Sequence, residues 1–158
     1  MVAPAIVLGL RGVQVLLSII VLGLTAYLVD AYTNPWASWS PHSLNFMLFT
    51  SVWTLLAVAY LVLSPTRFPR AAHKYAIGAV EFLTMLFWFA AFIAVAVLWG
   101  DIWWAGARRG TFYGCGVAAI VFSAFLWLTF VATTVLAALH IRRTPRNDTA
   151  PPPDMAGV

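Results

Sequence analysis

Four long apolar stretches separated by short polar segments dominate the chain. They run over residues 12–29, 44–63, 75–100 and 110–141, and they hold very few charged side chains. About 20 apolar residues are enough for a helix to cross a bilayer, so each stretch is long enough to span one. Backbone groups in lipid must be hydrogen-bonded within their own segment, which favours helices over strands. The pattern predicts four membrane-spanning helices, over about 6–30, 43–63, 75–100 and 110–141.

The connections between these stretches are short, which makes successive helices antiparallel neighbours. The predicted fold is all-α, an integral membrane four-helix transmembrane bundle that occupies residues 1–141 as one domain. The remaining residues, 142–158, are basic and contain three consecutive prolines. Such a composition is typical of a disordered tail.

Composition supports a membrane protein and argues against other classes. The chain is 63% hydrophobic and 9% charged, whereas an average soluble domain has about 25% charged residues. The net charge of +4 resides mainly in short loops and the tail, so we expect no nucleic-acid partner. Cys115 is the only cysteine, and the three histidines lack metal-ligand spacing. We find no catalytic pair and no phosphate-binding loop, and we predict a protein that is not an enzyme and has no cofactor.

Lysine and arginine positions predict the orientation. The second loop and the tail are basic, and the first loop has neither residue type, so the positive-inside rule places both termini in the cytoplasm. Arg108 and Arg109 in the third loop argue against this orientation. The residues that would meet anionic lipid of the inner leaflet are Arg67, Arg70, Lys74, Arg142, Arg143 and Arg146.

Tryptophans cluster near the two loops that this orientation places outside. Amphipathic rings favour the headgroup level of a bilayer. The cluster is either an ordinary aromatic belt or a surface that recognises lipid of the outer leaflet. Its members are Trp36, Trp39, Trp99, Trp103 and Trp104.

Arg11 directly precedes the first apolar stretch, and Glu81 lies within the third. Arg11 precedes Asp30 by 19 residues, and Glu81 precedes Asp101 by 20 residues. At about 1.5 Å per residue, both side chains lie roughly 30 Å from the outer polar boundary. Their helices run in the same direction, so the two charges lie at equal depth. We predict a salt bridge between them, because an unpaired charge in the membrane is costly.

Polar stripes support an inward orientation of both residues. Arg11, Gln14, Ser18 and Thr25 share one helical face, as do Glu81, Thr84, Trp88 and Phe92. Three roles stay open for the pair: fixing helix register and packing, a proton-coupled site at Glu81, or a lipid-headgroup site at Arg11.

Small residues recur every four positions near the start of the fourth stretch. Such spacing lets helices approach closely, either within the bundle or between copies in a homo-oligomer. The residues of this small-residue face are Gly106, Gly110, Gly114 and Ala118.

Several short motifs, in order, resemble a known family. They are Leu10-Arg11-Gly12-Val13-Gln14, Asn45-Phe46, Ser51-Val52-Trp53-Thr54, Glu81-Phe82-Leu83-Thr84 with Phe87-Trp88-Phe89-Ala90-Ala91-Phe92, and Phe125-Leu126-Trp127. Over residues 5–141 the chain resembles the fungal MARVEL-domain membrane proteins, specifically the group around the non-classical export protein Nce102.

The resemblance implies a non-enzymatic four-helix bundle of the plasma membrane that associates with sterol-rich lipid, vesicle trafficking and membrane apposition. For the fungal group it implies a role in furrows called eisosomes, with eisosome proteins as partners. We predict a tetraspan membrane-organising protein that associates laterally with itself and with sterol- or sphingolipid-rich outer leaflet and anionic inner leaflet. The alternatives are a small proton-coupled transporter or channel subunit that uses Glu81, or an accessory subunit of a larger membrane complex.

Overall fold

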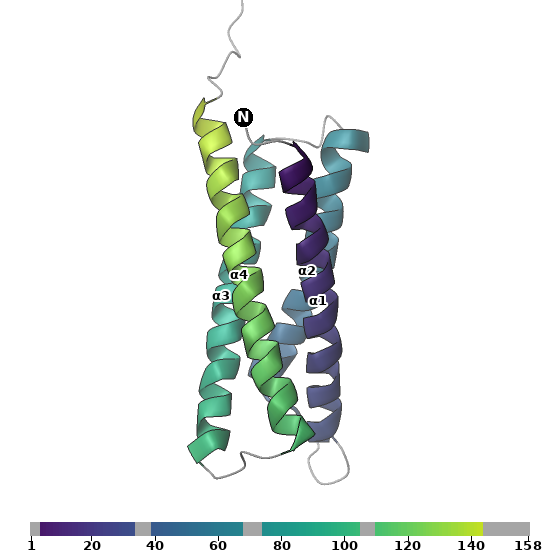
Figure 1. Cartoon of the computed structure of the whole chain (residues 1–158), viewed down its shortest axis with the longest axis vertical. Helices are drawn as coiled ribbons and strands as arrows, with labels where there is room; N and C mark the ends of the chain where they lie inside the picture. The colour runs from purple at the N-terminus through teal and green to yellow at the C-terminus, as the bar shows by residue number, and fades with distance from the viewer. Residues whose placement is uncertain (1–3, 34–38, 68–73, 105–109, 144–158) are drawn as a thin grey trace, which may run out of the picture.

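The chain folds into a bundle of four long helices (Figure 1). The computed structural model describes residues 4–33, 39–67, 74–104 and 110–143. The helices are α1 (Pro4–Thr33), α2 (His42–Arg67), α3 (Lys74–Trp104) and α4 (Thr111–Arg143). Each contains a candidate membrane span: Ile6–Thr33, His42–Leu63, Ala76–Ile102 and Thr111–Leu139. The predicted all-helical, four-span fold is confirmed.

The helices form a ring of antiparallel neighbours. α1 and α3 each pack against both α2 and α4, so α1 and α3 lie across the diagonal of the bundle. We call one end of the bundle the basic end, where α1 and α3 begin and α2 and α4 end; its terminal helical turns carry Arg67, Lys74, Arg142 and Arg143. The opposite end is called the far end.

The helices extend up to four residues beyond the predicted ranges. α1 continues past Asp30 to Thr33, and α3 continues past Asp101 to Trp104. Polar residues mark the membrane boundary, but a helix can continue through them into the headgroup region. α4 instead begins one residue later than predicted, because Gly110 has a left-handed φ of 107° that a helix does not allow.

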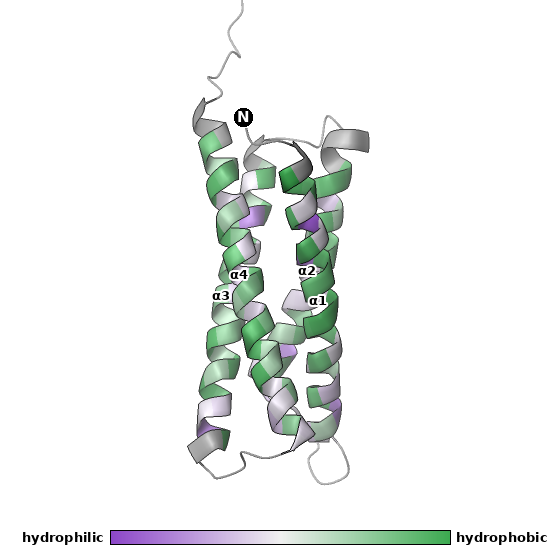
Figure 2. Ribbon diagram, viewed as in Figure 1, coloured by the Kyte–Doolittle hydropathy of each residue, from purple (hydrophilic) through white to green (hydrophobic). Residues whose placement is uncertain are grey.

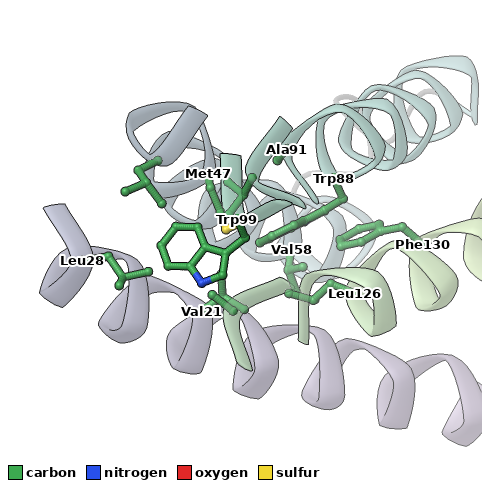
Figure 3. Close-up of a cluster of buried hydrophobic side chains, with 12 residues drawn as sticks. Val21, Leu28, Met47, Val58, Trp88, Ala91, Trp99, Leu126 and Phe130 are labelled. Carbon is green, nitrogen blue, oxygen red and sulfur yellow. The ribbon is translucent and has the colours of Figure 1, made fainter. Parts of the chain in front are cut away.

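Apolar side chains fill the core and also cover the outside. Buried side chains of the core include Val21, Leu28, Met47, Trp88 and Leu126, which meet between the helices in Figure 3. Large apolar side chains are exposed on all four helices, and Figure 2 shows hydrophobic colour along the full length of the bundle. An apolar exterior suits a chain whose surroundings are lipid. What distinguishes inside from outside is the set of buried polar side chains.

A tight contact joins α3 to α4 at the far end. The indole of Trp99 lies so close to Gly116 that an added Cβ there would overlap its ring. The same indole stacks on Phe112 and donates a hydrogen bond of 3.1 Å to the carbonyl of Tyr113. Gly116 is therefore the position at which the close approach of these two helices requires a glycine.

Candidate functional site

An ion pair crosses the diagonal of the bundle. The Arg11 Nη2 atom on α1 contacts the Glu81 Oε1 atom on α3. Both side chains are buried, Glu81 to 1% relative exposure. The structure therefore brings together the two charged residues that the sequence predicted to pair.

Two further side chains complete a polar network around this pair. Arg11 Nη1 donates a 2.8 Å hydrogen bond to Gln14 Oε1. The Thr133 hydroxyl on α4 donates to Glu81 Oε2 over 2.8 Å, and Gln14 Nε2 donates to Thr133 Oγ1 over 3.4 Å. Both carboxylate oxygens of Glu81 are thus satisfied. We call Arg11, Gln14, Glu81 and Thr133 the polar network.

Hydrogen bonds from neighbouring turns connect α2 to the other helices. On α1, the Ser18 hydroxyl donates to the carbonyl of Ser51 over 2.9 Å. The two remaining bonds link α2 and α3: Trp88 Nε1 donates to Thr54 Oγ1 over 2.9 Å, and Trp53 Nε1 donates to Thr84 Oγ1 over 3.1 Å. Together with the polar network, these bonds connect all four helices in a closed ring. Interhelical hydrogen bonds in membranes contribute about 0.6 kcal/mol each on average.

The inward polar stripes of α1 and α3 are confirmed. Arg11, Gln14, Ser18 and Thr25 are all buried, as are Glu81, Thr84 and Trp88, and Phe92 at the end of the second stripe is half-buried. From the sequence, Thr133 could be identified only as a threonine within a membrane-spanning helix, and its hydrogen-bond partner could not be assigned. It reaches Glu81 because α4 closes the ring against both α1 and α3.

The chemistry of this site is that of a fixed charge pair. A guanidinium stays protonated, and here both oxygens of the facing carboxylate already accept hydrogen bonds or ionic contact. No group of three His, Cys, Asp or Glu that could hold a metal occurs in the described part of the chain. The other described charged residues of the candidate spans, Asp30 and Asp101, are exposed at the far end. The arrangement can hold three helices in register.

The predicted outer tryptophans take different positions. Trp39 is 66% exposed between α1 and α2 at the far end. Trp99 departs from its predicted place in a lipid-facing surface: it is 3% exposed, because Gly116 leaves room for its indole inside the bundle. Trp103 and Trp104 form the last residues of α3, and Trp36 lies outside the described residues.

The predicted small-residue face does not pack within the bundle at its described glycines. Gly110 precedes α4, and a Cβ at Gly110 or Gly114 would meet nothing within 4 Å. Ala118 is half-buried, and Gly106 lies outside the described residues. The helix-packing glycine is Gly116 instead, which falls outside the four-residue repeat and was therefore missed in the sequence.

Four of the six predicted inner-leaflet residues lie in helix ends at the basic end of the bundle. Arg67 ends α2, Lys74 begins α3, and Arg142 and Arg143 end α4, so these last two belong to a helix and not to the predicted tail. Arg70, Arg146 and residues 144–158 lie outside the described residues.

A protein-family model matches most of this chain. The MARVEL family model, described as a membrane-associating domain, matches residues 4–136. No curated protein and no solved structure matches the chain. The matched region begins with α1 and includes every residue of the polar network.

Proposed function

Because the chain belongs to the MARVEL family, whose members are non-enzymatic membrane proteins, we propose that it is a tetraspan membrane-organising protein. Its four candidate spans make it an integral multi-pass membrane protein. In this proposal it associates laterally with copies of itself and with selected lipids, and so shapes or marks domains of the plasma membrane. The finer proposal is the role of the fungal Nce102 group, in eisosome or furrow organisation, trafficking or non-classical export.

The distribution of polar side chains is the observation that carries this proposal. The buried polar side chains of the ring are engaged with one another and link the helices. The outside of all four helices presents large apolar side chains. The buried hydrogen bonds and the ion pair thus hold the helices together. The exposed apolar surface of the helices is the one that remains for contacts with lipid and with partner proteins.

The orientation we propose puts the basic end in the cytoplasm. Lysine and arginine near a membrane favour the cytoplasmic side, and each contributes about 1 kcal/mol of attraction to anionic lipid. Residues at the described ends of α2, α3 and α4 supply this charge at one level of the bundle. Such attraction would hold the basic end against anionic inner-leaflet lipid and would weaken in high salt.

Self-association through α4 would provide the lateral contact. Gly114, Ala118, Val121 and Phe125 follow one another at spacings of four, three and four, so they lie on one helical face. Gly114, Val121 and Phe125 are exposed, and Val121 and Phe125 also line an apolar groove of about 310 Å³ between α3 and α4. Copies in one membrane share the same orientation, so two such faces would meet as parallel helices. Small residues at the start of the face let the backbones approach.

Two alternative functions would use different parts of the molecule. A proton-coupled transporter or channel subunit would need Glu81 to release and bind protons, whereas both its oxygens are engaged by Arg11 and Thr133. An accessory subunit of a larger complex would use the apolar surface for other proteins in place of copies of itself. The engaged carboxylate favours the membrane-organising role over proton transfer.

Photobleaching recovery of the fluorescently tagged protein in fungal cells tests the proposal. We expect immobile plasma-membrane patches for the unaltered chain, and dispersal of these patches by Glu81→Gln at matched expression. Asp30→Asn, which changes an exposed carboxylate of α1, is the matched control and should leave the patches unchanged. A uniform, freely diffusing signal in all three cases would contradict the proposal, and proton flux in liposomes would then test the transporter.

A further inference from the structure

The outer faces of the four helices are apolar over unequal lengths. On α2 every exposed residue from Phe49 to Leu63 is apolar, and on α4 every exposed residue from Gly114 to Leu139 is apolar or glycine. At about 1.5 Å per residue, these apolar runs cover ~21 Å of α2 and ~38 Å of α4. α2 and α4 lie across a diagonal of the ring, because each packs against both α1 and α3. The shortest and the longest apolar runs of the described helices are therefore on opposite sides of the bundle.

At the basic end the apolar runs of α2 and α4 stop at the same level. Levels along the bundle follow from the contacts between helices: the polar network aligns α1, α3 and α4, and the two indole hydrogen bonds align α2 with α3. With about 1.5 Å per residue along each helix, Leu63 and Leu139 lie within ~2 Å of one level. The difference in length between the two runs is therefore located at the far end.

At the far end the polar boundary of α2 lies closer to the bilayer centre than that of its neighbours. Asn45 is exposed, and the Ser40 hydroxyl fixes its amide by a 2.7 Å hydrogen bond to Oδ1. Asp30 of α1, Asp101 of α3 and Thr111 of α4 are the exposed polar residues that follow the apolar runs of those helices. They lie roughly 8–13 Å farther out than Asn45. We call this difference the far-end step.

The two helices that flank α2 have intermediate heights. Their exposed apolar runs reach Tyr27 on α1 and Val97 on α3. By the same alignment these two residues lie at one level, about 10 Å beyond Phe49 and ~5 Å short of Gly114. The apolar surface at the far end therefore rises from α2 through α1 and α3 to α4, on both sides of the bundle.

Tilting the bundle cannot remove the far-end step. A tilt that aligned α2 with α4 at the far end would separate them at the basic end, where the two runs already stop together. In a bilayer of uniform thickness, either lipid becomes thinner beside α2 or the exposed polar side chains of His42 and Asn45 enter hydrocarbon. Both outcomes cost free energy.

We propose that the far-end step makes the bundle line-active, which means that it prefers the edge between a thinner and a thicker region of bilayer. The α2 side then faces the thinner region and the α4 side faces the thicker region, so the hydrophobic mismatch falls on both sides. The property of the lipid that is selected is the length of its acyl chains. This inference deepens the proposed membrane-organising function and rests on it, because it states where in a membrane domain the chain would gather.

Lipid quenching at two labelled positions tests the inference. In a chain with Cys115→Ser, a bimane fluorophore is attached to Leu56→Cys on α2 or to Leu128→Cys on α4, both of which are exposed far from the helix ends. The vesicles contain dimyristoleoyl and dierucoyl phosphatidylcholine, one of them brominated as the quencher, and little protein, so that copies of the chain stay apart. We expect the short lipid to be enriched at α2 and the long lipid at α4, with relative binding constants that differ about threefold or more.

A levelled variant separates the far-end step from other properties of the two faces. Asn45→Leu lengthens the apolar run of α2, and Gly114→Gln with Val117→Gln shortens that of α4, so the two runs then end within about 3 Å of each other. The matched control is Ser40→Ala with Gly114→Ala and Val117→Ala, which keeps the exposed amide of Asn45 and the apolar face of α4. The levelled variant should bring the two binding constants together, and the control should keep them apart. Equal constants at both faces of the otherwise unaltered chain, or a difference that the levelled variant retains, would overturn the line-active assignment.

Single-molecule imaging measures the preference for edges directly. The supported bilayers contain distearoyl phosphatidylcholine gel beside fluid dimyristoleoyl phosphatidylcholine. We expect the unaltered chain to gather at the edges and the levelled variant to spread through the fluid, whereas a uniform distribution of the unaltered chain would overturn the inference. Photobleaching patches in cells report the proposed function separately. Patches that persist although both faces select the same lipid would reject the line-active assignment alone, and a face difference without patches would reject the proposed function alone.

Discussion

At the scale of single residues, Arg11 and Glu81 depend on each other. Each is buried, and each has the other as its ionic partner within the described chain. Removing one partner of a buried pair leaves an uncompensated charge and costs about 3–5 kcal/mol. The stabilising effect of each of the two side chains therefore depends on the presence of the other.

We expect Arg11→Gln and Glu81→Gln each to lower the free energy of unfolding by about 3–5 kcal/mol. The exchanged double variant, Arg11→Glu with Glu81→Arg, should recover part of this loss because opposite charges again face each other. Equilibrium unfolding in mixed detergent micelles measures the effect. Unchanged stability in both single variants would show that the ion pair does not hold the bundle together.

Gly116 provides a second residue-scale prediction with a close control. Gly116→Ala places a Cβ against the Trp99 indole and should destabilise the bundle by about 1–3 kcal/mol, the usual cost of overpacking. Gly114→Ala adds the same methyl group two residues earlier, where nothing lies within 4 Å, and should leave monomer stability nearly unchanged. Thermal melting of the monomeric protein in detergent compares the two. Equal melting temperatures for both variants would contradict the tight contact.

Sequence reasoning recovered some residue positions and not others, for physical reasons. Two opposite charges at equal depth in the membrane are each costly unless they pair. The pairing of Arg11 and Glu81 was therefore predictable. A tryptophan near the headgroups has the same local sequence whether it faces lipid or the core. The burial of Trp99 depends on space at Gly116, more than a dozen residues later in the chain, and no periodicity in α3 reveals it.

At the scale of helices, α2 is joined to α3 by two indole hydrogen bonds that run in opposite directions. Trp88 donates to Thr54, and Trp53 donates to Thr84. Replacing Trp88 by Phe keeps most of the buried ring and removes one bond. We expect a loss of about 0.6–1.7 kcal/mol in the free energy of unfolding, from the average to the maximum measured for such bonds in membranes.

The same detergent unfolding assay on Thr54→Val and on the double variant with Trp88→Phe completes a cycle. The two single losses should not add, because both changes remove the same bond. Fully additive losses would show that this hydrogen bond contributes nothing and that packing explains each effect.

The outer face of α4 gives the second prediction at this scale. Gly114→Ile should lower self-association in vesicles at least about fivefold, or ~1 kcal/mol, because a branched side chain prevents parallel α4 helices from approaching. Monomer stability should not change, since the position has free space around it. Energy transfer between labelled copies at increasing protein-to-lipid ratios measures the association. An unchanged transfer curve would exclude Gly114 from the interface between copies.

At the scale of the whole molecule, four apolar runs with short connections were enough to predict the four-helix fold. They were not enough to predict that α1 and α3 lie across a diagonal. Short loops make successive helices neighbours, but the packing of α4 against α1 depends on which helix faces contact each other in the folded bundle. Once the ring is closed, Thr133 lies within reach of both Gln14 and Glu81.

The proposed orientation makes a prediction for the molecule as a whole. In a chain whose native Cys115 is replaced by serine, Trp39→Cys at the far end should react with a membrane-impermeant thiol reagent added to intact cells. Arg67→Cys at the basic end should react only after permeabilisation. The reverse pattern would invert the topology and move the basic end outside.

The diagonal ion pair also has a consequence for how the chain is made. Arg11 enters the membrane with the first helix, and Glu81 is synthesised 70 residues later. At about 5–20 residues per second, the arginine waits for about 4–14 s without its acidic partner. During that interval the first helix carries a charge without its ionic partner, which is costly inside a bilayer. A message that ends before the third helix would yield a product with that charge permanently exposed, a feature by which cellular quality control could distinguish an unfinished chain from a finished one.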